Sequence, residues 1–338
     1  MKNRYLNMDF LRIVCAFAIV IIHVTSASLT YAKAPTNVAT IAMHLSTILM
    51  AWAVPCFFML TGFVWLGNEK ECTYKTIGKH VLKFFVVLFT IGLFYAMLEI
   101  VYDTRTINIY TIFKSFINVL RGKLWDHMWY VYAVIGVYIV LPLLKPFFIR
   151  SKFKDDAIVL LLSFFYTIFV PILSDALDYS IPIKFVATGW IFYVMLGGVV
   201  GKYSKIFIER KCFVTTVCLI SMLLSNTAII LKCINEPSFH VVSYTSLSVA
   251  LMAAAVFVIF TVQTVKNKRM LLSVSSCCWG IYLIHPAFIN LMIKVLNFNP
   301  IDYAWYISIP LTCVVIFALS AVIVWALRKI GIVRKFIL

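Results

Sequence analysis

The feature that most constrains this chain is a series of long apolar runs that recurs along nearly its whole length. Runs of roughly 17–25 apolar residues are long enough to cross a bilayer as helices. They lie at residues 10–29, 41–66, 81–101, 127–148, 157–173, 185–201, 213–231, 242–265, 274–296 and 305–327. We therefore expect an all-α protein, a polytopic membrane helix bundle of about ten transmembrane helices that forms a single domain over residues 1–338.

The composition supports a membrane protein. Hydrophobic residues make up 63% of the chain and charged residues 13%, whereas soluble domains are near half apolar and a quarter charged. The first run is too long for the core of a secretory signal peptide, and it lacks a clear small-residue cleavage site. We expect it to remain as the first membrane span.

The distribution of positive charge predicts the orientation. The net charge is +17, and the lysines and arginines gather in every second connection between the apolar runs, as at 70–83, 145–154, 202–211 and 328–335. Because cytoplasmic loops of membrane proteins carry the excess of lysine and arginine, both termini are expected in the cytoplasm. The basic excess thus needs no nucleic acid to explain it.

Several kinds of site have no motif in the sequence. Nine cysteines are scattered without a CxxC pair, and no cysteine–histidine spacing suits zinc. There is no GxSxG elbow, no phosphate-binding loop and no HExxH. We expect no metal, no hydrolytic triad and no ATP-driven engine, and we interpret the cysteines as small residues packed between helices.

The first apolar run contains an arginine and a histidine whose spacing places them on one helix face. Arg12 and His23 are eleven residues apart, which at ~100° each makes three turns plus ~20°, so they share a helix face ~16 Å apart along the axis. Asp9 precedes Arg12 by three residues, close enough for an ion pair. Taken singly, Arg12 could snorkel to the surface and His23 could bond to a neighbouring helix. Their shared face favours a ligand that spans the gap.

Other ionisable residues fall toward the predicted outer ends of the runs. His44 and His127 lie at the outer ends of the second and fourth runs, where interfacial placement alone would explain them. His285, well along the ninth run, and Glu99, in the third, are better candidates for a polar cavity around His23.

The outer connections also contain aromatic and amphipathic segments. Trp129 and Tyr130 fit an interfacial aromatic belt, and they could instead stack on a sugar. Within the longest outer connection, apolar residues recur at helical spacing from Ile109 to Val119, which predicts an interfacial or re-entrant helix.

Four stretches in order resemble the acyltransferase family 3 membrane proteins, which include O-acetyltransferases of surface polysaccharides. "LNMDFLRIVCAFAIVIIHV" is similar to their first span, where an arginine is followed by ten residues and a histidine. "VPCFFMLTGFVWLG" resembles a family segment in which Thr61 replaces the usual serine. "HMWYVYAVIGVYIVLPLL" and "GIYLIHP" resemble two further segments. The resemblance covers essentially the whole chain.

The resemblance implies an acyl-CoA-dependent O-acetyltransferase in the inner membrane of a bacterial-type cell. Acetyl-CoA would be the acyl donor, and a cell-envelope glycan or a lipid-linked sugar would accept the acetyl group directly in the membrane part. The other partner would be membrane lipid. By this resemblance His23 is the general base, Glu99 or His285 holds its imidazole, Arg12 with Asp9 forms the donor site, and the acceptor contacts are Trp129, Tyr130, His127 and His44.

One alternative comes from a different class. The family is related to the membrane part of vancomycin-resistance serine racemases, and the same polar cavity would suit a carrier of a small polar solute such as serine. A carrier, however, does not need a cationic end lined up with a deep base. Neither an inverted repeat nor a pair of broken helices is visible in the sequence.

Overall fold

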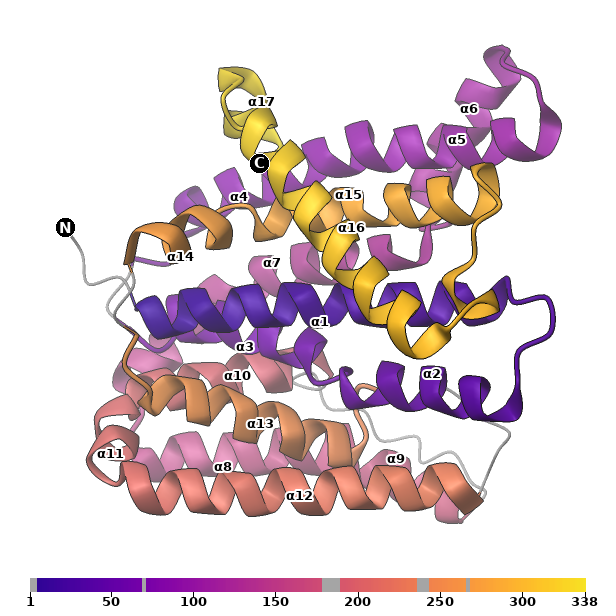
Figure 1. The fold of residues 1–338 in the computed structure, drawn as a ribbon. Coiled ribbons are helices and arrows are strands. Elements are labelled where there is room, and N and C mark those ends of the chain that lie inside the picture. Colours follow the sequence, from indigo (N-terminus) through magenta and orange to yellow (C-terminus); the bar gives the residue numbers. More distant parts are fainter. Residues whose placement is uncertain (1–4, 69–70, 178–188, 236–242, 266–267) are drawn as a thin grey trace. The chain divides into compact units, whose positions relative to one another are not determined.

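The all-α prediction is confirmed over the residues that the computed structural model describes, which are 5–68, 71–177, 189–235, 243–265 and 268–338. These residues form helices joined by short connections, with no strand among them (Figure 1). They pack as two units. The larger unit comprises Met1–Lys70 and Phe148–Val324, and the smaller comprises Glu71–Phe147 and Trp325–Leu338.

Eight of the ten predicted runs form helices that are long and apolar enough to cross a membrane. They are Leu6–Thr30, Asn37–Trp65, Tyr74–Thr104, Asp126–Arg150, Phe153–Ala176, Lys211–Ile234, Cys278–Val295 and Trp305–Leu327. The runs at 185–201 and 242–265 correspond to the shorter apolar helices Trp190–Lys202 and Leu247–Val262, and 185–188 and 242 lie outside the described residues. The protein is a polytopic helical membrane protein.

The larger unit is built around the first helix, α1 (Leu6–Thr30), which contacts α2, α3, α13, α14 and α15. Figure 1 shows α14 and α15 running alongside α1. The other helices of this unit are α2 (Asn37–Leu49), α3 (Ala53–Trp65), α8 (Phe153–Phe164), α9 (Val170–Ala176), α10 (Trp190–Lys202), α11 (Ser204–Glu209), α12 (Lys211–Asn235), α13 (Leu247–Val262), α14 (Lys268–Ser275) and α15 (Cys278–Asn290).

Glycines allow α3 and α10 to cross with their backbones in contact. A Cβ atom placed on Gly62 would lie 1.7 Å from the carbonyl oxygen of Val194, and one on Gly197 would lie 2.0 Å from that of Met59. Membrane helices associate through such small residues, since lipid tails are as apolar as a leucine side chain and close packing must supply the attraction. This crossing is the most extensive contact between any two described helices.

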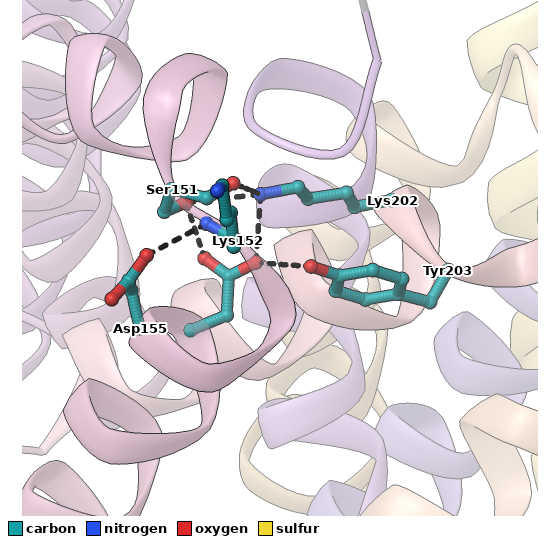
Figure 2. Close-up of polar contacts among 6 residues, drawn as sticks. Ser151, Lys152, Asp155, Lys202 and Tyr203 are labelled. Atoms are coloured by element: carbon teal, nitrogen blue, oxygen red, sulfur yellow. Dashed lines mark hydrogen bonds and ion pairs between the residues drawn. The ribbon is translucent and has the colours of Figure 1, made fainter.

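A buried ion pair joins the start of α8 to the end of α10 (Figure 2). The Asp156 carboxylate is 2% exposed. It accepts hydrogen bonds from Lys202 Nζ at 2.7 Å, Tyr203 OH at 2.7 Å and Ser151 Oγ at 2.6 Å. Lys202 Nζ also donates to the Ser151 carbonyl oxygen at 2.8 Å. Partial burial, the hydrogen bond to Asp156 and its negative charge raise the pKa of Tyr203 to about 12, so this hydroxyl stays a donor at neutral pH.

The smaller unit contains α4 (Tyr74–Val87), α5 (Leu93–Thr104) and α6 (Ile109–Leu120). A π-helical turn, Leu88–Gly92, joins α4 to α5. The predicted helix in the long connection is thus confirmed as α6, and its interfacial position stays a prediction. Its hydroxyl-bearing face, with Thr111 and Ser115, is buried, and the opposite apolar face is exposed, as Phe113 shows.

Two long helices and a short terminal one complete the chain. α7 (Trp129–Arg150) and α16 (Trp305–Leu327) each cross the division between the units, and α17 (Gly331–Phe336) contacts α4. Side chains cap several helix starts: Thr36, Thr73, Asn108 and Ser246 each accept a hydrogen bond from the backbone N–H three residues later.

Candidate functional site

The candidate site lies along α1, which hydrogen bonds fix at both ends. Near its start, Asn7 Nδ2 donates to the carbonyl oxygens of Phe260 and Thr261 at the end of α13, at 2.9 and 3.0 Å. Near its other end, the hydroxyls of Thr25 and Thr47 lie 2.9 Å apart and join α1 to α2. These contacts set the depth and rotation of α1 within the larger unit.

An ion pair with a bridging serine forms near the N-terminal end of α1. Arg12 Nη1 donates to Asp9 Oδ1 at 2.8 Å, so the ion pair expected from the sequence is present. Ser275, the last residue of α14, donates through Oγ to the same carboxylate oxygen at 2.7 Å and accepts from Arg12 Nη1 at 3.2 Å. Asp9 and Ser275 are each 3% exposed, while the Arg12 side chain is 33% exposed. The cation is therefore accessible, whereas the groups that hold it are buried.

Two histidines meet farther along the same helix. The rings of His23 and His285 have centroids 5.2 Å apart and planes inclined by 46°. His285 is fully buried, and His23 is half-buried.

The backbone around His285 fixes the tautomer of that ring. Nδ1 lies 2.9 Å from the carbonyl oxygen of Ile281, and because a carbonyl only accepts, a neutral His285 carries its hydrogen on Nδ1. Nε2 then bears the lone pair. Pro286 follows directly and lacks the N–H that would bond to Tyr282, which loosens α15 at this turn.

The Arg12–Ser275 contact and the His23–His285 contact both lie where α1 packs against α14 and α15, an interface called the seam below. Arg12 and His23 are eleven residues apart, a rise of ~16 Å along α1. Ser275 and His285 are ten residues apart across the turn that joins α14 to α15. Because Arg12 meets Ser275 and His23 meets His285, α1 runs parallel to α14 and α15 in matched register. Arg12 and His23 thus share a face, as their spacing predicted.

The other predicted site residues belong to other helices than α1 and α15. His44 is in the middle of α2, one turn before Thr47, rather than at the start of its helix. Glu99, His127, Trp129 and Tyr130 belong to the smaller unit. A role for Glu99 beside His23 therefore stays a prediction.

In the smaller unit, Glu99 is part of an aromatic cluster. Its Oε2 atom accepts a hydrogen bond from Trp125 Nε1 at 2.7 Å, and the Trp125 ring stacks on Tyr95 with centroids 4.2 Å apart. His127 is 3% exposed and lies edge-on to Tyr95 at 5.6 Å. At the start of α7, Trp129 meets Tyr130 edge-to-face, with a centroid separation of 6.0 Å.

Sequence reasoning missed Ser275, Trp125 and Tyr95. The signal for Ser275 was its position ten residues before His285, which matches the spacing of Arg12 and His23. The signal for Tyr95 was its place one helical turn before Glu99. Trp125 stands in an irregular connection, and the sequence offers no periodicity that would bring it to Glu99.

The contact of α1 with α14 and α15 presents a guanidinium group near the start of α1 and two imidazole rings farther along it. Within the described parts of the chain, no group of three or more histidine, cysteine, aspartate or glutamate residues could hold a metal ion. The guanidinium group has five N–H donors, and both contacts described above use Nη1. Among the described residues no contact of Nε or Nη2 is seen, so these atoms can bind an anionic oxygen, and an imidazole farther along the helix can accept a proton.

Comparison with known proteins identifies the family. A family model described as an acyltransferase domain, that of acyltransferase family 3, matches residues 5–328. No curated protein and no solved structure matches the chain. Since the family model covers nearly its whole length, the chain belongs to acyltransferase family 3 and is a multi-pass membrane acyltransferase.

Proposed function

We propose that this acyltransferase moves an acetyl group from cytoplasmic acetyl-CoA to a hydroxyl of a cell-surface glycan or a lipid-linked sugar. The observation that carries the proposal is the seam of α1 with α14 and α15, on which an accessible cation and a pair of histidines lie ~16 Å apart. The pantetheine arm of CoA is about as long as this gap. A donor held by its phosphates at one end would thus present its thioester at the other.

Arg12 suits the donor's phosphates. Arginine binds phosphate oxygens through paired N–H donors, and such charge-assisted hydrogen bonds are stronger than neutral ones. Asp9 is buried against Arg12 and Ser275, so we assign it to holding the guanidinium rather than to contacting the donor. The cytoplasmic position of this end follows from the distribution of lysine and arginine.

His23 would act as the general base. Its neutral imidazole takes the proton of the acceptor hydroxyl while that oxygen attacks the thioester carbonyl carbon. When the tetrahedral intermediate collapses, the C–S bond breaks and the imidazolium returns the proton to the CoA sulfur. The products are an O-acetyl ester and CoA, and His23 is neutral again.

His285 would keep His23 in the working tautomer. With its hydrogen on Nδ1 and directed to Ile281, His285 can only accept at Nε2. The two rings lie beside each other, with centroids 5.2 Å apart, so a rotation of the His23 ring toward that lone pair would let one of its nitrogens donate there and leave the other nitrogen basic. For the acceptor we propose stacking and hydrogen bonding by Trp129, Tyr130, His127 and His44, as their residue types permit.

The test uses membrane vesicles from producing cells, which supply the native acceptor, together with radiolabelled acetyl-CoA. Label should move from CoA into the glycan or lipid fraction. His23→Ala should lower this transfer by at least about 100-fold, because general base catalysis contributes roughly 10²–10⁴. His80→Ala is the matched control, since His80 on α4 is not among the residues proposed to bind the donor or the acceptor.

Two outcomes would count against the proposal. Transfer at the wild-type rate by His23→Ala would remove the general base. Solute uptake that proceeds without any transfer of label would instead support the carrier. Vesicles from cells without the protein give the background for both measurements.

A further inference from the structure

Ser275 stands out among the residues that the proposed chemistry does not use. Its hydroxyl is buried between the two charges of the Asp9–Arg12 pair, 2.7 Å from Asp9 Oδ1 and 3.2 Å from Arg12 Nη1. It comes from α14, more than two hundred residues along the chain from α1. A hydroxyl both donates and accepts, so one serine can satisfy the carboxylate and the guanidinium together.

The arrangement fixes an otherwise flexible side chain. An arginine side chain has many rotamers, and binding must remove that freedom unless the side chain is already held. Asp9 alone offers Arg12 a single anchor oxygen within the same helix. Ser275 adds a second anchor from α14, because its Oγ atom accepts from Arg12 Nη1. The same hydroxyl donates to Asp9 Oδ1, the oxygen that holds Nη1. Both anchors engage Nη1, which leaves Nε and Nη2 available to an anion.

We propose that Ser275 is a positioning residue for the acyl donor, because it holds the Arg12 guanidinium in the orientation that binds the phosphates of acyl-CoA. This inference rests on the donor site of the proposed function. Ser275 itself need not touch the donor. Its position also connects the donor end of the seam to the histidine end, since α15 begins three residues later and carries His285.

The test compares two competitive inhibitors of acetyl transfer in the membrane-vesicle assay described above, because the vesicles supply the acceptor. CoA carries the phosphates, whereas pantetheine has the same thiol arm without them. The ratio of their inhibition constants measures the phosphate contribution. Ser275→Ala should raise the KM for acetyl-CoA about three- to tenfold, the effect expected from the loss of one hydrogen bond. The ratio of the inhibition constants of pantetheine and CoA should fall by a similar factor, and kcat should change less than about twofold.

Two matched variants separate positioning from general packing. Ser276→Ala removes the neighbouring hydroxyl, which bonds to Ser273 within α14, and should leave the KM and the ratio unchanged. Ser275→Thr keeps a hydroxyl and should restore at least part of the ratio. Thermal unfolding without ligand shows whether each variant is folded.

The outcomes distinguish this inference from the proposed function. If Arg12→Ala narrows the ratio but Ser275→Ala does not, Ser275 is not a positioning residue and the donor site stands. Equal weakening of CoA and pantetheine by Ser275→Ala would likewise overturn the inference, since a packing defect acts on both. If Arg12→Ala leaves the ratio at its wild-type value, the donor site itself is wrong.

Discussion

The crossing of α3 and α10 offers a sharp test of the structure. Gly62 on α3 faces the backbone of α10, and an added methyl group would lie 1.7 Å from the Val194 carbonyl oxygen. Gly197 on α10 faces α3 in the same way, 2.0 Å from the Met59 carbonyl oxygen. Neither obstacle is a flexible side chain, so Gly62→Ala or Gly197→Ala can be accommodated only if the two helices move apart.

The magnitude follows from that movement. A carbon and a carbonyl oxygen rarely approach closer than about 3.3 Å, so the helices must separate locally by about 1.5 Å. A gap of 0.5–1 Å already forfeits roughly a quarter to a half of each van der Waals contact. Overpacking typically costs about 1–3 kcal/mol, and this crossing belongs at the upper end. The better helix propensity of alanine returns up to about 1 kcal/mol, which leaves a loss of at least about 2 kcal/mol.

The assay is the unfolding midpoint of the purified protein in one detergent, followed by helical circular dichroism during heating or titration with a denaturing detergent. Gly136→Ala on α7 is the matched control, because a Cβ there meets nothing within 4 Å. We expect the midpoint of Gly62→Ala to fall by several degrees and that of Gly136→Ala to stay or rise. If the two variants unfold together, the backbone contact of α3 with α10 is wrong.

Two further predictions concern the buried ion pair at the end of α10. Lys202→Met should destabilise the protein by about 2 kcal/mol, less than the loss of a fully buried pair would, because the Lys202 side chain is 23% exposed. Lys205 is exposed, so Lys205→Met should change the unfolding midpoint little. Equal midpoints for the two variants would contradict a stabilising Lys202–Asp156 ion pair. Tyr203 has its pKa raised to about 12 in the folded protein, so its contribution to stability is complete below about pH 10 and is lost as the pH rises through 12. The difference in stability between wild type and Tyr203→Phe should therefore shrink between about pH 10 and 12, and a constant difference would refute a neutral Tyr203 donor.

The apolar runs predicted the helices because a run of about 20 consecutive apolar residues is enough to indicate a membrane-spanning helix. Eight runs became helices of spanning length, and α6 appeared where its periodicity placed it. What the runs did not predict is how helices pair. The contact of α3 with α10 depends on Gly62 and Gly197, which are far apart in sequence, and a glycine in an apolar run carries no sign of the partner it will face.

The site was predictable where it is local and unpredictable where it is not. The shared face of Arg12 and His23 followed from one helix and its 3.6-residue period. Ser275 did not, because its relation to Arg12 exists only once α14 lies beside α1. The hydrogen bond from Trp125 to Glu99 was unpredictable for the same reason, because Trp125 stands in an irregular connection.

The position of the Asp9–Arg12 pair and of the two histidines indicates a role beyond stability. Ionisable side chains within membrane helices are costly, so their retention calls for a reason. α1 is already joined to α2 and α13 by hydrogen bonds from Thr25 and Asn7, and the Asp9–Arg12 pair and the two histidines are not needed to attach it. Because the two polar contacts lie at different depths on one face, substitution at the cationic end should act on donor binding, and substitution at the histidine end on the rate of transfer. A bundle that merely tolerated these residues would show no such division.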